Sequence, residues 1–282
     1  MNACAFLVEQ VLKVRKVIST SALGACRTFL TQNPISNVLP LGDLYSPLFQ
    51  VSDVFEAVEK NQVVGVCAIY RAFSTPSVVL GTGTHETKET LVREALSKIS
   101  TNFISLCDPN DIDIFKKYST TLHCHHEQQM TANPPEKIEC GNINVDKIRE
   151  NELESLDGFY IEHGAETWVP IQFKAGPYYC VRHEGQIVSA AGVHLATPQI
   201  AQLGNIVTDE AYRNRGFTTA CTEALATDFA SKRRIITLFI RTENAPAIHI
   251  IYEKLGFCRA RNITFLVMRK NAHACKAGKM AY

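Results

Sequence analysis

The same order of predicted elements occurs twice in this chain, and this repetition constrains the fold more than any other feature. On either side of the proline-containing stretch at 134–137, a strand hairpin precedes a strand, a helix, a strand, a helix and a last strand. The period of about 125 residues is too long for a solenoid repeat. We therefore expect an α/β fold (α+β, mixed sheet) of two tandem domains, 1–135 and 136–282. The alternative is two α+β domains that share an element order by chance.

The turns of the two hairpins are predicted at Lys60 and Asn61 in the first half and at Glu184 and Gly185 in the second. The remaining predicted elements are strands at 77–83, 103–107 and 122–130 with helices at 88–99 and 111–118, then strands at 200–207, 235–240 and 263–268 with helices at 217–229 and 246–257.

Composition and charge exclude several classes of function. The 29 Lys and Arg residues nearly balance the 28 Asp and Glu residues, so a net charge of +1 gives no basis for a nucleic-acid or membrane partner. Glu9, Lys13, Arg15 and Lys16 interrupt the apolar start of the chain, which we interpret as an amphipathic helix rather than a signal peptide. The ten cysteines lie scattered, mostly in apolar segments, which indicates reduced thiols and a cytoplasmic protein.

The densest group of metal-ligand side chains is the sequence HCHH, from His123 to His126. Neighbouring side chains of an extended strand point to opposite faces, so at most two of these four converge. No second ligand pair follows at zinc spacing. We therefore expect a strand with solvated histidines and no metal, with a metal site as the alternative.

The turn YRNRGFTT at 212–219 begins an apolar period of 3.6 residues. The first turn of a helix leaves backbone N–H groups without internal partners, and phosphate is their natural ligand. Gly216 removes the Cβ that would hold an anion away, while Arg213 and Arg215 can add charge-assisted hydrogen bonds. A solvated basic turn is the alternative interpretation.

The corresponding turn of the first half, GTGTHETKET, has different chemistry. It carries Glu86 and Glu89 and has no basic residue before Lys88. We therefore expect one anion site in the chain and place it in the second half.

A second motif follows in RTENAPAIHIIYEKLGF. Asn244 precedes Pro246 at the predicted start of a helix, and Gly256 is typical of a helix end. Tyr252 lies one turn before that end. Taken alone, Tyr252 would be a half-buried packing residue with its hydroxyl in water.

Together the two motifs resemble those of the GNAT superfamily of acyl-coenzyme A N-acyltransferases. The first motif of that superfamily, R/QxxGxG/A, corresponds to 213–218, and the second couples an asparagine, an alanine and a tyrosine ahead of LGF, as in Asn244, Ala247 and Tyr252. The resemblance covers about 145–270. The first half resembles the same fold more weakly. It is similar to the degenerate N-terminal domain of two-domain GNAT members, which include relatives of glycine N-acyltransferases.

The resemblance implies a tandem pair of GNAT-like domains with one coenzyme A site. The amides at 214–219 would hold the pyrophosphate, the strand edge at 206–208 would pair with the pantetheine arm, and Asn244 would contact that arm. The implied cofactor-binding residues are Ile206, Val207, Thr208, Arg213, Asn214, Arg215, Gly216, Phe217, Thr218, Thr219, Asn244, Ala247 and Tyr252.

Two positions depart from the superfamily pattern. Thr218 stands where glycine or alanine is usual, which would crowd the pyrophosphate while offering it a hydroxyl donor. Tyr252 follows Asn244 by eight residues instead of seven, and the extra residue rotates one of them by about 100° unless a bulge or a shifted helix start absorbs it. Tyr252, which is anchored to LGF, is therefore the firmer of the two predictions.

By the same resemblance, the primary amine of a small molecule or amino acid attacks the thioester of acetyl-CoA directly, without a metal. Tyr252 would be the catalytic residue that protonates the leaving thiolate, and backbone N–H groups near Val207 would polarise the carbonyl. A lysine-like amine costs about 4.6 kcal/mol to deprotonate at pH 7 and an α-amine about 1.4 kcal/mol, so the need for a base depends on the acceptor. His194 and Glu166 are candidates, and we interpret both as structural.

The function we expect is an acetyl-CoA-dependent N-acetyltransferase that acts as a monomer or homodimer. One alternative is a non-catalytic acyl-CoA-binding or interaction protein. The other is an N-acyltransferase that uses longer acyl-CoA, as glycine N-acyltransferases do.

Overall fold

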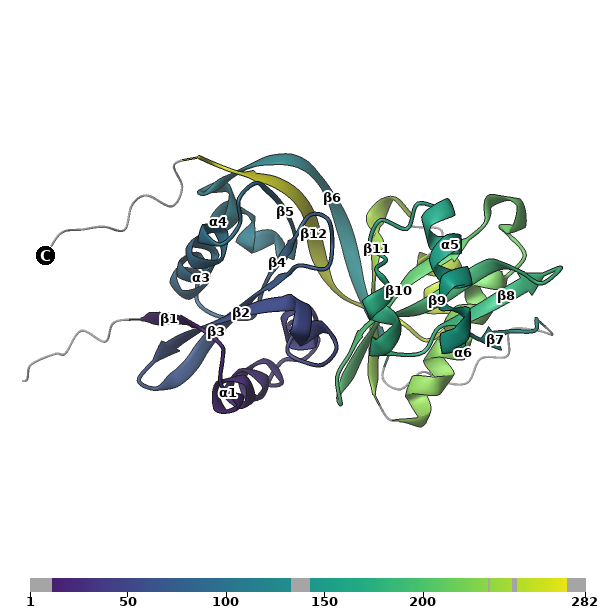
Figure 1. Ribbon diagram of the computed structural model, residues 1–282, viewed down its shortest axis with the longest axis horizontal. Helices are drawn as coiled ribbons and strands as arrows, with labels where there is room; N and C mark the ends of the chain where they lie inside the picture. The colour runs from purple at the N-terminus through teal and green to yellow at the C-terminus, as the bar shows by residue number, and fades with distance from the viewer. Residues whose placement is uncertain (1–11, 133–142, 233, 245–247, 273–282) are drawn as a thin grey trace, which may run out of the picture.

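A single mixed sheet runs through both halves of the chain (Figure 1). The computed structural model describes residues 12–132, 143–232, 234–244 and 248–272. Within these residues the sheet has 12 strands in the order β1-β2-β3-β4-β5-β12-β6-β11-β10-β9-β8-β7. The predicted mixed-sheet α/β fold is confirmed.

The first half contains the first six strands. The hairpin of β2 and β3 turns at Lys60 and Asn61, as predicted, and both residues have positive φ (51° and 61°). Its strands and helices are β1 (Lys13–Lys16), α1 (Thr20–Leu30), α2 (Val38–Gly42), η1 (Leu48–Val51), β2 (Ser52–Glu59), β3 (Gln62–Tyr70), β4 (Ser77–Leu80), α3 (His85–Ser97), β5 (Asn102–Cys107), η2 (Pro109–Asp111), α4 (Ile112–Lys116) and β6 (Ser119–Ala132).

The second half repeats the order. Its hairpin turns at Glu184 and Gly185, again at positive φ (49° and 82°). Its strands and helices are β7 (Asp146–Lys147), η3 (Glu150–Glu152), α5 (Leu153–Glu162), η4 (Pro170–Ala175), β8 (Tyr179–His183), β9 (Gln186–Ala196), β10 (Ile200–Thr208), η5 (Glu210–Tyr212), α6 (Phe217–Ser231), β11 (Ile235–Arg241), η6 (Thr242–Asn244), η7 (Ile248–Glu253) and β12 (Cys258–Lys270).

In each half, helices cover both faces of the sheet. They do so because the central strands carry apolar side chains on both faces. In the first half, α3 and α4 pack on the face that carries Phe55 and Cys67, and α1 and α2 pack on the face that carries Val54 and Val66. In the second half, α6 packs on the face of Val181 and Ala191, and α5 packs on the opposite face.

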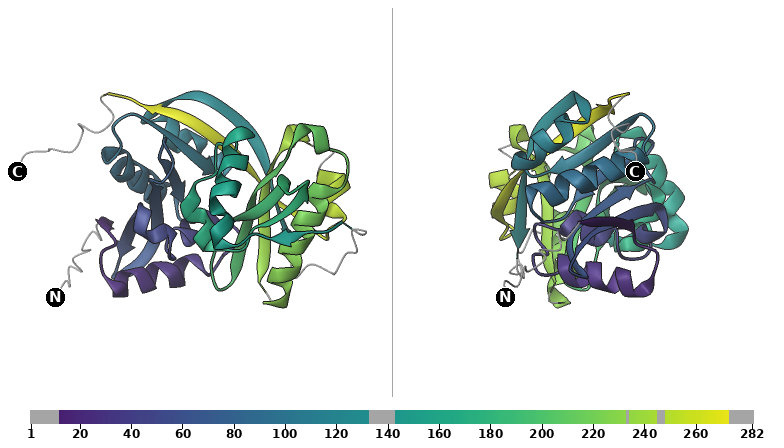
Figure 2. Two further views of the ribbon diagram at one scale, coloured as in Figure 1. Left: turned by 45° about the vertical axis from the view of Figure 1, so that its right-hand side comes forward. Right: turned by 90° about the vertical axis from the view of Figure 1, so that its left-hand side faces the viewer.

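The two halves exchange their last strands. β12 lies between β5 and β6 and pairs antiparallel with both. β6 in turn pairs with β11, so it continues the sheet of the second half. Figures 1 and 2 show these two long strands side by side, arching from one half to the other. The sheet is thus continuous across the predicted boundary at 135/136, and that boundary stays a prediction.

Several segments differ from the sequence prediction or lie outside the described residues. The predicted N-terminal amphipathic helix is wrong for Lys13–Lys16, which form β1 and pair with β2; residues 1–11 lie outside the described part. The linker at 134–137 also lies outside it. Helices α1, α2 and α5 occupy segments to which the sequence pattern assigned no element.

Candidate acyl-coenzyme A site

The site is created where β10 and β11 separate. These parallel strands pair only from Ile200 to Gln202, opposite Ile235 to Thr237. Beyond Gln202 the register of β10 with β9 shifts twice, and Asn205 takes a left-handed conformation (φ 51°). The edge of β10 that faces β11, including the predicted residues at 206–208, is therefore not paired to β11.

A cavity of about 440 Å³ opens at this separation and extends between the two halves. Its apolar walls come from β4, β5, β10, β11 and β12. Its polar lining comprises Asp43, Tyr70, Ser77, His125, Glu127, Glu166, Thr167, Gln172, His194, Gln202, Asn205, Arg241, Asn244 and Tyr252.

The start of α6 is open to a ligand. Gly216 is the N-cap residue, in a left-handed conformation (φ 80°), and provides no side-chain cap. The first helical hydrogen bond runs from Ala220 N to Gly216 O at 3.0 Å, which leaves the amides at 217–219 available. A Cβ at Gly216 would lie 3.3 Å from Ile143 Cδ1, so the position is confined as well as left-handed.

Side chains around this turn leave its amides free. Arg213 forms an exposed ion pair with Glu210 (3.0 Å), and Arg215 lies over the ring of Tyr212 and donates to Ala211 O. Thr218 Oγ1 lies 2.8 Å from Thr208 Oγ1, in a chain that continues to Ser189. The hydroxyl of Thr218 is therefore engaged with β10, and the expectation that it crowds the pyrophosphate has no support in this geometry.

The corresponding helix start in the first half is closed. Thr84 caps α3 by accepting from Thr87 N at 3.2 Å, and Asn37 Oδ1 accepts from Thr82 N at 2.8 Å. Lys88, on the first turns of α3, is paired with Asp111 at 2.8 Å in a mostly buried position. The amides of Thr82 and Thr87 and the Lys88 ammonium are therefore already engaged within the first half.

Tyr252 lies in η7, a π-helix that contains one more residue per turn than an α-helix. This geometry absorbs the extra residue between Asn244 and Tyr252, and both residues line the cavity. Asn244 is exposed at its rim, whereas Ala247 lies outside the described residues. Gly256 ends the helix at φ 79°, as predicted.

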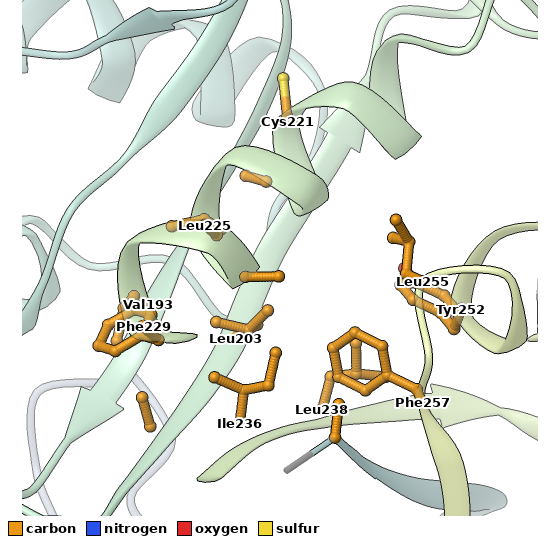
Figure 3. Close-up of a cluster of buried hydrophobic side chains, with 14 of the residues drawn as sticks. Val193, Leu203, Cys221, Leu225, Phe229, Ile236, Leu238, Tyr252, Leu255 and Phe257 are labelled. Carbon is orange, nitrogen blue, oxygen red and sulfur yellow. The ribbon is translucent and has the colours of Figure 1, made fainter. Parts of the chain in front are cut away.

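Burial fixes the ring of Tyr252 and its protonation state. The residue is 7% exposed and meets Phe257 edge-on at 6.0 Å. Figure 3 shows this pair beside Leu238, with Leu225 and Phe229 of α6 over Leu203 of β10. Burial raises the pKa of Tyr252 to about 12, so its hydroxyl carries a proton throughout the physiological range.

His194 belongs to a hydrogen-bond chain that sets its tautomer. Gln172 Nε2 donates to Thr167 O, and Asn205 Nδ2 donates to Gln172 Oε1 at 2.9 Å. Asn205 Oδ1 is therefore the acceptor for His194 Nε2–H, also at 2.9 Å. The network leaves Nδ1 of His194 unprotonated.

Two further features define the environment of His194. Its ring lies against Gly204, where a Cβ would be 2.3 Å from His194 Cδ2. Burial lowers its pKa, although the bond to Asn205 opposes the shift, so the ring is neutral near pH 7. Glu166 is exposed at the cavity rim. Both residues line the cavity that Tyr252 also lines, and their interpretation as structural stays a prediction.

Cys221 lies in the hydrophobic core, whereas His125 of the HCHH stretch lines the cavity. Cys221 is fully buried and burial raises its pKa to about 12, so it is not a nucleophile. The HCHH stretch is part of strand β6, and the ring nitrogens of His123 and His125 lie 3.4 Å apart. Among the described residues, no group of three or more His, Cys, Asp and Glu side chains is placed to hold a metal ion. In the same residues, no helix has the length and apolarity needed to cross a membrane.

Comparison with known proteins agrees with this geometry. The FR47-like protein family model matches residues 179–266, from β8 into β12, which include α6 and Tyr252. A tandem GNAT protein from the clavulanic acid biosynthesis pathway superposes with a TM-score of 0.60 over 92% of this chain and 98% of its own, at 11% identity. The chain has a tandem GNAT fold.

Other solved structures also match most of the chain. A Drosophila protein covers 93% of this chain and 99% of its own (TM-score 0.66, 11% identity). A GNAT-family acetyltransferase from Colwellia psychrerythraea covers 92% and 100% (TM-score 0.56, 16% identity). At these identities the superpositions establish the fold. No curated protein matches the chain in sequence. The GNAT-like fold that the two motifs implied is confirmed.

Sequence reasoning did not single out the residues that the first half contributes to the cavity. Asp43 follows α2 and Tyr70 ends β3, about 180 to 210 residues before Tyr252 in the sequence. In the sequence, the sign of this contribution was the occurrence of polar residues within otherwise apolar segments of the first half.

Proposed function

We propose that this protein is an acyl-CoA N-acyltransferase that transfers an acetyl group to the primary amine of a small molecule. The observation that supports it most is the uncapped start of α6 beyond an unpaired β10 edge, with Ile206 of that edge and Tyr252 lining one cavity. The residues fit coenzyme A: the amides at 217–219 would bind its pyrophosphate and the edge at 206–208 its pantetheine amides. Bound acyl-CoA supplies the activated acyl thioester.

The chain's own residues account for the proton transfers. His194 Nδ1 accepts a proton from the acceptor ammonium, and Tyr252 holds a proton that it donates toward the leaving sulfur. Burial raises the pKa of Tyr252 to about 12, so the phenol keeps its proton until the leaving sulfur can accept it. Backbone N–H groups near Val207 polarise the carbonyl.

A longer acyl group is a second candidate, because a cavity of about 440 Å³ exceeds what an acetyl group fills. Comparing acetyl-, butyryl- and octanoyl-CoA in one thiol-release assay separates the two. The non-catalytic alternative predicts coenzyme A binding without turnover of any amine.

Replacing Gly216 by valine is the test of the cofactor site. A β-branched residue at φ 80° disturbs the turn and displaces its amides. Each charged hydrogen bond is worth about 1.5–3 kcal/mol, so we expect the Kd for coenzyme A to rise at least about tenfold in calorimetry. Gly185→Val is the matched control, because Gly185 has φ 82° in a hairpin turn with open space around it. Unchanged binding by Gly216→Val would reject this site.

Replacing His194 by glutamine tests the base. Glutamine keeps an N–H donor for Asn205 but has no basic nitrogen. We expect kcat to fall by about 100-fold for a lysine-like amine. The wild-type kcat should decline as the pH falls through the pKa of His194, below about 6.5, because the protonated ring cannot accept a proton.

The His194→Gln variant should lose this acidic limb of the pH profile. His85→Gln, whose side chain is exposed on α3, should retain both the rate and the limb. If the kcat of His194→Gln still declines at acidic pH as it does in the wild type, another group is the base.

A further inference from the structure

Three polar groups on the cavity wall have no partner among the described residues. The hydroxyl of Tyr70 and the Oε1 atom of Gln202 are buried without a hydrogen bond. The carboxyl group of Asp43, in a residue that is 6% exposed, has neither a hydrogen bond nor an ion pair within the described part of the chain. Buried polar groups in native proteins are normally satisfied, so two such atoms together with an unpaired carboxyl group on one cavity indicate a missing ligand group.

The fold brings these three groups to the same part of the cavity. Asp43 follows α2, and Gly42 packs so tightly on Leu195 that a Cβ would lie 2.5 Å from its Cδ2 atom. Leu195 is the strand partner of Gln202. The charge of Asp43 acts on Tyr70 and contributes to the raised pKa of that phenol.

The chemistry of the three groups selects a cation. A carboxylate, an amide oxygen and a phenol oxygen are all acceptors, and an ammonium group has three N–H donors. Burial raises the pKa of Asp43 to about 8, which means that no cation of the chain compensates it. An ammonium in contact with Asp43 would lower that pKa again and restore the carboxylate.

Charge in the rest of the cavity favours the same choice. The carboxyl groups of Glu127 and Glu166 line the cavity in addition to that of Asp43. Arg241, which is exposed at the end of β11, contributes a positive charge to the lining. Glu127 already accepts from His125 at 2.9 Å, so it is the less available of the buried carboxyl groups.

This cation subsite lies away from the place where acyl transfer would occur. Gln202 is the last β10 residue paired to β11, whereas the edge that would face the acyl-CoA begins at Ile206. Four residues of a regular strand span about 13 Å, and the register shifts and left-handed Asn205 of β10 make this distance an upper bound. The wall between them is apolar, with Leu203 and Leu238 among its residues.

We propose that Asp43, Tyr70 and Gln202 bind a second cationic group of the acceptor, so that the acceptor is an extended diamine or polyamine with an apolar spacer. This inference rests on the proposed function, because it assigns the substrate class of that site.

The test compares α,ω-diaminoalkanes of increasing length with n-alkylamines of the same length, using acetyl-CoA and thiol release. We expect kcat/KM to favour the diamines at least tenfold, with an optimum at intermediate length. Asp43→Asn and Tyr70→Phe should each reduce this preference at least fivefold. Asp113→Asn, at a side chain that is 85% exposed, and Tyr179→Phe, outside the cavity lining, are the matched controls. Equal kcat/KM for diamines and monoamines at every length would overturn the proposal.

Calorimetry separates failure of this inference from failure of the proposed function. The coenzyme A-bound protein is titrated with the same diamines and monoamines, without an acyl donor. Selective binding of a diamine that is lost in Asp43→Asn supports the subsite even if no amine is acylated, in which case the proposed reaction alone fails. Absence of selective binding rejects the subsite whether or not turnover is observed.

Discussion

Replacing Tyr252 by phenylalanine is expected to lower kcat by about 100-fold while the KM for acyl-CoA changes little. The substitution removes one hydroxyl from a ring whose packing against Phe257 is retained. Proton donation by a positioned side chain typically contributes about 10²–10⁴-fold to a rate. Steady-state kinetics with an amine from the active panel measures the effect.

The pH dependence of the wild type gives a second readout of Tyr252. Its pKa of about 12 keeps the phenol protonated, so activity that depends on it is lost only as the pH rises through about 12. We therefore expect no alkaline fall in kcat from this residue below pH 10. Tyr179→Phe is the control, because the Tyr179 hydroxyl contacts Asp228 and not the cavity. If Tyr252→Phe retains the full kcat while binding coenzyme A, Tyr252 is a packing residue and the proposed mechanism fails.

Replacing Leu266 by alanine is expected to destabilise both halves together. Leu266 belongs to β12 but is 1% exposed in the hydrophobic core of the first half, with Phe103 and Phe115. Buried Leu→Ala substitutions cost about 2–5 kcal/mol. Urea unfolding can be followed by the fluorescence of Trp168, the single tryptophan, which lies in the second half, and by hydrogen exchange of the β5 amides in the first. Both probes should shift to the same lower midpoint.

The matched control is Leu122→Ala. Leu122 lies on the exchanged strand β6 but is 46% exposed, so its loss should change the free energy of unfolding by less than about 0.5 kcal/mol. Two separate transitions in Leu266→Ala, with Trp168 unaffected, would show that the halves unfold independently despite the shared sheet.

Local sequence signals predicted the hairpins and the α6 turn well. The turns at Lys60–Asn61 and Glu184–Gly185 are short, and each contains one residue that tolerates positive φ, Asn61 or Gly185, so local sequence is enough to predict them. The glycine at 216 is a comparable local signal. The sequence indicated the π-helix η7 only indirectly. The extra residue between Asn244 and Tyr252 called for a bulge or a shifted helix start, without saying which.

Features that depend on distant residues were not predictable from the sequence. The stretch Lys13–Lys16 has helical apolar spacing, yet pairing with β2 makes it a strand. The closure of the first-half turn depends on Asn37, which is 45 residues from Thr82. His194 looked structural because its partner Asn205 and the glycine behind its ring are specified only by the strand register.

The exchanged strand also determines when the first half can become complete during synthesis. The ribosome finishes β5 at Cys107, but its neighbour β12 begins only at Cys258, about 150 residues later. At about 5–20 residues per second, β5 and β6 wait roughly 8–30 seconds for the strand that belongs between them. The N-terminal half is made first and completed last, so its open sheet edges are exposed to other nascent chains during that interval.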